Sequence, residues 1–82
     1  MKLRLRYFAS LRESLGKAHE DMTTDAQTVG KLRDQLLAQG GAYLCLARGK
    51  AVRMALNQVM VEEDAPITDN AELAFFPPVT GG

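Results

Sequence analysis

The chain has 82 residues, of which 46% are hydrophobic, and it carries ten basic and ten acidic residues, so its formal charge is zero. This length fits one domain with a modest core, and the composition is typical of a folded protein. The neutral charge argues against a general nucleic-acid binder, which needs a basic surface. No apolar run is long enough to span a membrane, and we recognise no signal peptide. A single cysteine cannot form an internal disulfide, so we expect a cytoplasmic protein without nucleic-acid or membrane partners.

The first quarter of the chain predicts a strand and a short helix. Residues 2–8 alternate, with Leu3, Leu5 and Tyr7 on one face and mostly basic side chains on the other, as in a half-buried strand. Residues 9–15 predict a short helix that ends at Gly16 and begins with a capping box of Ser10 and Glu13.

The middle of the chain predicts a second strand and the main helix. Residues 19–25 form the strand, although their alternation is poor. Thr28 is the expected N-cap of the helix, in which Val29, Leu32 and Leu36 recur at helical spacing before Gly40-Gly41 ends it.

The second half is richer in strands. Residues 42–48 fit a short helix or a strand equally well, and residues 50–56 predict a strand followed by a turn at Asn57-Gln58. After the short apolar run 59–61, the acidic run 62–64 is expected to be a solvated loop. A last strand over 72–76 is stopped by Pro77-Pro78.

These elements predict an α+β domain over residues 1–76. The natural arrangement is a mixed sheet of about five strands with one main helix packed on one face.

Most motifs of enzymes and metal sites are missing. His19 is the only histidine and Cys45 the only cysteine, so neither a catalytic triad nor a zinc site is expected. The apolar neighbours of Cys45 favour a buried small side chain rather than a reactive thiol. We therefore expect no metal and no cofactor bound by the chain itself.

The C-terminal residues 77–82 differ from the rest and are expected to form a flexible tail. Two prolines favour a stiff exit from the sheet, and six extended residues reach about 20 Å. Gly81 and Gly82 have no Cβ, so they can enter a narrow channel in another protein. A carboxylate there, once activated as an acyl-adenylate, can accept sulfur or form an amide. The tail is thus expected to be a reactant, with the catalytic groups on partners.

The segments YFASLRESLG (7–16) and RMALNQVMVEEDAPITDNAELAFFPPVTGG (53–82) resemble the MoaD family, the small sulfur-carrier subunits of molybdopterin synthase. The resemblance covers nearly the whole chain and implies the ubiquitin-like, ThiS-type β-grasp fold. It also implies that Gly82 is adenylated with ATP by an E1-like adenylyltransferase of the MoeB type. A sulfur donor then converts Gly82 to a thiocarboxylate. This thiocarboxylate donates sulfur to cyclic pyranopterin monophosphate, which forms the dithiolene of molybdopterin.

The resemblance further implies a non-catalytic subunit within an assembly of two small and two large subunits, with the catalytic groups on the large subunit. Gly82 would bear the sulfur, with Gly81 as its slim neighbour. The residues expected to bind partners are Phe8, Arg12, Met60, Phe76, Pro77, Pro78, Val79 and Thr80.

Alternatives remain at this point. Met60 and Phe76 could be ordinary core residues, and Arg12 could be a solvated arginine on a helix. The chain could also be a carrier of another pathway, such as the thiamine pathway, a ubiquitin-like protein modifier, or an interaction module with an unreactive tail.

Overall fold

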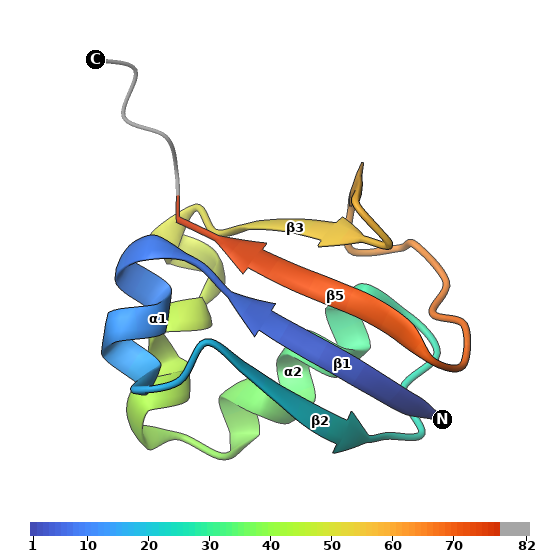
Figure 1. The fold of residues 1–82 in the computed structure, drawn as a ribbon, viewed down its shortest axis with the longest axis horizontal. Coiled ribbons are helices and arrows are strands. Elements are labelled where there is room, and N and C mark those ends of the chain that lie inside the picture. Colours follow the sequence, from blue (N-terminus) through green and yellow to red (C-terminus); the bar gives the residue numbers. More distant parts are fainter. Residues whose placement is uncertain (78–82) are drawn as a thin grey trace.

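The structure is a computed structural model that describes residues 1–77. In chain order the elements are β1 (Lys2–Tyr7), α1 (Ala9–Leu15), β2 (His19–Thr23), α2 (Val29–Ala38), the 3₁₀ helices η1 (Gly41–Leu46) and η2 (Arg48–Lys50), β3 (Arg53–Leu56), β4 (Val59–Val61) and β5 (Ala71–Phe76). This order agrees with the one predicted from the sequence (Figure 1).

The strands form one mixed sheet in the order β2-β1-β5-β3-β4 (Figure 1). β1 runs antiparallel to β2 and parallel to β5, and β3 runs antiparallel to both β5 and β4. Because β1 and β5 are parallel neighbours, the ends of the first and last strands lie side by side. Phe8 and Phe76, far apart in the sequence, are thereby brought together.

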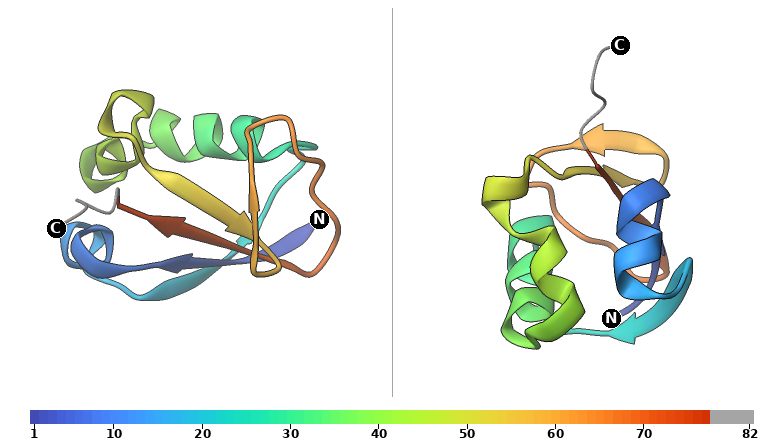
Figure 2. Two further views of the ribbon diagram at one scale, coloured as in Figure 1. Left: turned by 90° about the horizontal axis from the view of Figure 1, so that it is seen from above. Right: turned by 90° about the vertical axis from the view of Figure 1, so that its left-hand side faces the viewer.

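The hydrophobic core lies between the sheet and α2. Leu5 is fully buried and Tyr7 is 2% exposed, which confirms the predicted alternation along β1, and Phe75 of β5 is also fully buried. From the other side Leu32 and Leu36 of α2 are no more than 1% exposed. Figure 2 shows α2 over one face of the sheet and α1 at one end of the sheet. The face turned away from α2 is called the open face below.

Helix α1 has the predicted bounds but not the predicted start. Its N-cap residue is Phe8, with extended φ and ψ of −120° and 153°, and no side chain caps it. Ser10 lies inside the first turn, so the predicted capping box of Ser10 and Glu13 is wrong, because such a box needs its serine at the N-cap. Gly16 ends the helix as predicted, with a φ of 73° in the left-handed region that glycine tolerates best.

The segment that fitted either a helix or a strand forms the two 3₁₀ helices. Since η2 extends to Lys50 and Ala51 then adopts a φ of 57°, β3 begins at Arg53 and not at residue 50 as predicted. Arg33 of α2 holds this segment, because its Nε donates to the Leu46 carbonyl at 2.6 Å. Arg33 is 3% exposed, so its guanidinium group is part of the interior.

The N-terminus of α2 is capped from two directions. The Thr28 Oγ1 accepts a hydrogen bond from the Lys31 amide at 3.3 Å, which confirms Thr28 as the N-cap. The acidic segment supplies the other cap, since the Glu63 carbonyl accepts from the Gly30 amide at 2.8 Å. The Glu63 carboxylate also accepts from Arg48 Nε at 2.8 Å. The interpretation of residues 62–64 as plain solvated surface is therefore wrong for Glu63.

Within residues 1–77, none of the helices combines the length and apolar character that crossing a bilayer requires.

Candidate functional site

The open face carries an apolar row that runs from β5 to the edge strand β4. Ala55 of β3 lies opposite Ala74 of β5 on one side and opposite Met60 of β4 on the other. Both alanines are small and are 4% and 5% exposed, whereas Met60 is 55% exposed. Met60 is thus a surface residue at the edge of this row. The alternative that it belongs to the core is excluded.

Phe8 and Phe76 form the other end of this apolar area. Their rings stack with centroids 4.8 Å apart and planes 11° from parallel. The Phe8 amide donates to the Phe75 carbonyl at 3.2 Å, which fixes the start of α1 against the end of β5. Phe75 points into the core and Phe76 is half-buried on the opposite face, as strand alternation requires. Two predicted partner-binding residues are therefore in direct contact.

A basic side chain covers the stack. The Arg6 guanidinium lies 5.3 Å from the centroid of the Phe8 ring, within the range of a cation–π interaction. Its Nη1 also lies 3.6 Å from the Glu72 carboxylate of the neighbouring strand. Both members of this ion pair are partly exposed, so its own contribution to stability is small.

Pro77 is the last residue that the structure describes, and it is half-buried. It lines a small pocket together with α1 residues and with Cys45, Lys50 and Val52. Cys45, predicted to be buried, is half-buried, and burial raises the pKa of its thiol. A raised pKa keeps the thiol protonated near neutral pH, so the structure agrees with an unreactive cysteine.

Arg12 is exposed on α1, and within residues 1–77 its side chain makes no hydrogen bond or ion pair. Partner contact and simple solvation of Arg12 therefore remain equal alternatives. The other predicted site residues lie outside the described residues: Pro78, Val79, Thr80, Gly81 and Gly82.

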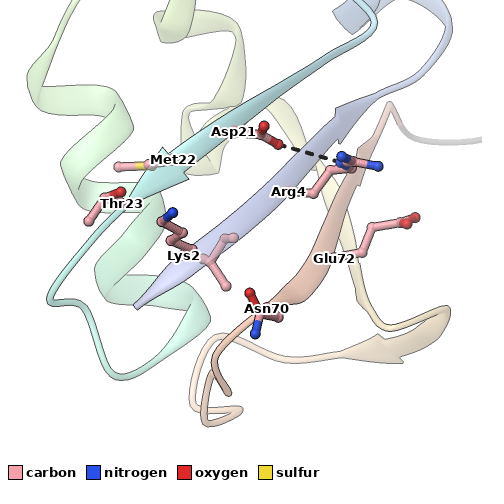
Figure 3. Close-up of a pocket in the computed structure, with 8 residues that line it drawn as sticks. Lys2, Arg4, Asp21, Met22, Thr23, Asn70 and Glu72 are labelled. Carbon is pink, nitrogen blue, oxygen red and sulfur yellow. Dashed lines mark hydrogen bonds and ion pairs between the residues drawn. The ribbon is translucent and has the colours of Figure 1, made fainter.

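A second hollow lies at the opposite end of the open face, away from Pro77 (Figure 3). Polar and charged residues line it together with Leu3 and Met22, and Arg4 Nε pairs with the Asp21 carboxylate at 3.4 Å. Arg4 and Asp21 thus neutralise each other within the chain. In the part of the chain described, moreover, no group of three or more histidine, cysteine, aspartate or glutamate residues is placed to hold a metal ion.

Sequence reasoning missed three residues of the site, namely Arg6, Ala55 and Ala74. The alternation of β1 placed Arg6 on the same face as Phe8, which was a usable signal. The two alanines gave none, because their place in the row depends on the register among β3, β4 and β5. The resulting surface combines a stacked aromatic pair, next to the point where residues 77–82 begin, with an exposed methionine, and the two nearly buried alanines lie between them. Such a surface suits protein docking rather than catalysis.

The family model described as the ThiS family matches residues 5–82. The chain belongs to the ThiS family. The chain is also similar to the molybdopterin synthase sulfur carrier subunit of Escherichia coli, strain K12. It is 42% identical over 81 residues, which cover 98% of this chain and 99% of the relative.

Solved structures agree on the fold of this ThiS-family chain. The small archaeal modifier protein 1 (SAMP1) of Haloferax volcanii superposes with a TM-score of 0.79 at 25% identity, over 100% of both chains. A chain from the complex of subunits 1 and 2 of the molybdopterin-converting factor of Helicobacter pylori gives a TM-score of 0.71 at 23% identity, again over 100% of both chains. The predicted ubiquitin-like β-grasp fold is confirmed, with its mixed five-stranded sheet and main helix.

Proposed function

We propose that this chain is the sulfur-carrier subunit of a molybdopterin synthase. The observation that carries the proposal is the similarity, over nearly the full length of both chains, to the Escherichia coli subunit of that name. The described surface supports it, because the stacked pair of Phe8 and Phe76 lies directly beside Pro77, where the reactant tail would begin.

The chemistry of the cycle assigns the reacting atoms to Gly82. A carboxylate is a poor electrophile, so its oxygen first attacks the α-phosphate of ATP on an E1-like adenylyltransferase, and pyrophosphate leaves. A donor then delivers sulfur at the sulfide level, and this nucleophile displaces AMP and leaves a thiocarboxylate on Gly82. The thiocarboxylate sulfur finally bonds to a carbon of cyclic pyranopterin monophosphate, and water then cleaves the bond between this sulfur and the Gly82 carbonyl carbon, which restores the Gly82 carboxylate. In this cycle the partners supply the catalytic groups, as the resemblance to the MoaD family implies.

The large subunit of the synthase is the proposed docking partner, in an assembly of two small and two large subunits. Met60 and the row of Ala55 and Ala74 would lie against an apolar surface of that subunit, while the tail enters its active site. The same face would dock on the adenylyltransferase at another stage of the cycle.

Mass spectrometry and a deletion test this proposal. In protein isolated from its native host, part of the population should carry sulfur in place of one oxygen at Gly82. Removal of Gly82 should abolish molybdopterin formation with the purified large subunit and leave the unfolding temperature unchanged. An unmodified terminus in every growth condition, or full activity of the shortened chain, would refute the carrier role.

A second candidate is a protein modifier, favoured by the structural likeness to the archaeal modifier protein. It uses the same activated carboxylate but transfers it to a lysine amine and forms an amide. The two functions differ in their products. Conjugates of this chain with other proteins, isolated under denaturing conditions and absent when Gly82 is deleted, would support the modifier.

A further inference from the structure

A chain of contacts connects a charged residue of β1 to the root of the tail. The Arg6 guanidinium lies over the Phe8 ring at 5.3 Å, and the Phe8 ring stacks on Phe76 at 4.8 Å. Glu72 holds the other side of Arg6 at 3.6 Å. Phe76 is followed immediately by Pro77. The position of the Arg6 side chain is thereby coupled to the last residue of β5.

The two prolines that follow Phe76 leave little freedom to absorb a change in its orientation. A residue that precedes proline is restricted to extended conformations, and both Phe76 and Pro77 precede one. The proline ring also fixes φ near −65°. A rotation of the Phe76 backbone would therefore be passed on to Pro77.

We infer that Arg6 is a positioning residue for tail delivery: by covering Phe8 it fixes the Phe8–Phe76 stack, and the stack sets the direction in which the chain leaves the sheet. This inference rests on the proposed carrier function. Arg6 itself need not touch the partner. By fixing the exit direction, Arg6 lowers the conformational entropy that the tail loses when it enters a narrow channel. This is the general advantage of preorganisation.

The chain offers a matched control in Arg4. It lies on the same strand and the same open face, two residues before Arg6, and its side chain is also exposed. Its Nε pairs with Asp21, on the side of β1 away from β5. Arg4→Met therefore makes the same chemical change without touching the stack.

The test is a double-mutant cycle between Arg6 and the tail. The dissociation constant for the purified large subunit is measured by calorimetry for the full chain and for a chain that ends at Pro77, each with and without Arg6→Met. The shortened chain keeps the whole buried core, which lies between Leu3 and Phe75. Arg6→Met should weaken binding of the full chain about two- to fivefold, the loss expected for an exposed cation–π contact. It should leave binding of the shortened chain unchanged.

An equal loss in both chains would make Arg6 an ordinary docking contact and would overturn the inference, as would no loss in either. Arg4→Met should change neither constant. Arg6→Lys, which keeps a cation over the ring, should restore most of the full-chain affinity, and an Arg6→Lys variant as weak as Arg6→Met would also overturn the inference. Failure of the unaltered full chain to bind the large subunit would instead refute the proposed function, and this inference with it.

Discussion

The backbone amide of Gly30 donates to the backbone carbonyl of Glu63 at 2.8 Å, so an acidic loop lies directly on the first turn of α2. The Val29 amide is satisfied in the same way by the Ala65 carbonyl at 3.0 Å. The first amides of a helix have no partner within it, and here the chain's own backbone supplies that partner. This close approach explains why a residue without a side chain stands at position 30.

Gly30→Ala should destabilise the protein even though alanine favours helices. A Cβ at position 30 would lie 3.0 Å from the Glu63 Cβ and 3.1 Å from the Glu63 carbonyl oxygen, so the Glu63 backbone would have to shift by a few tenths of an ångström and strain its bond to the Gly30 amide. Helix propensity alone would raise the free energy of unfolding by about 1 kcal/mol. We expect it instead to fall by about 1–3 kcal/mol, because the contact with Glu63 is overpacked. Urea unfolding measures this change. Gly49→Ala is the control, because no heavy atom lies within 4 Å of its added Cβ, and equal effects of the two variants would contradict the prediction.

Met60→Ser should weaken partner docking without unfolding the domain. Met60 is 55% exposed on the open face, so losing its side chain costs little in the free chain but removes apolar area from the interface. We expect a loss of about 1 kcal/mol in binding to the large subunit, measured by calorimetry. Val59→Ser is the matched control. Val59 is 64% exposed on the same strand but on the opposite face, and a similar loss there would argue against docking through the open face.

Glu20 should make the stability of the domain depend on pH in the acidic range. Burial alone would raise the pKa of its carboxyl, but hydrogen bonds from Tyr43, Tyr7 and Lys17 outweigh burial and lower the pKa. A carboxyl with a lowered pKa stabilises the fold above its unfolded value of about 4.3. That stabilisation is lost as the pH falls through the lower value of the folded state.

At pH 7, Glu20→Gln should accordingly unfold at a lower urea concentration than the unaltered chain. Its free energy of unfolding should be lower by about 1 kcal/mol. The difference should shrink at pH 3 and below. A difference that stays constant between pH 7 and pH 2.5 would show that the charge of Glu20 contributes nothing.

Arg33→Ala should destabilise the protein far more than the loss of an exposed charged residue does. Its Nε donates to the carbonyl of Leu46, a fully buried residue, and the Arg33 side chain itself is 3% exposed, so its removal leaves both a buried acceptor and a cavity. We expect the free energy of unfolding to fall by about 2 kcal/mol or more, together with faster hydrogen exchange in residues 41–50. Arg53→Ala, at an exposed arginine, should change it by less than about 0.5 kcal/mol. A loss at Arg33 no larger than that at Arg53 would contradict the assigned role.

The parts of the fold that were predictable have patterns decided by local rules. Leu3, Leu5 and Tyr7 alternate because one face of β1 is buried, and Thr28 caps α2 with its own side chain. The sequence pattern of β2 was poor because it is an edge strand: its side chains are exposed on one face and only half-buried on the other, so the inner face can carry a charged residue such as Glu20.

The parts that were not predictable depend on contacts between distant segments. Residues 41–50 form 3₁₀ helices that a buried arginine holds from α2, and no local pattern announces such an anchor. In the candidate site, the sequence identified Phe8, Met60 and Phe76. Their junction with Arg6 and the two alanines required the pairing of β1 with β5 and of β3 with its neighbours.

The place of β5 in the sheet has a mechanical consequence. In the proposed carrier cycle, any force on a tail held by a partner would reach the domain through the end of β5. Because β5 is bonded to β1 on one side and to β3 on the other, a pull along its axis loads both ladders in shear. An edge strand under the same load would be held by one ladder instead of two. The central position of β5 therefore helps the domain to stay folded when force is applied through the end of this strand.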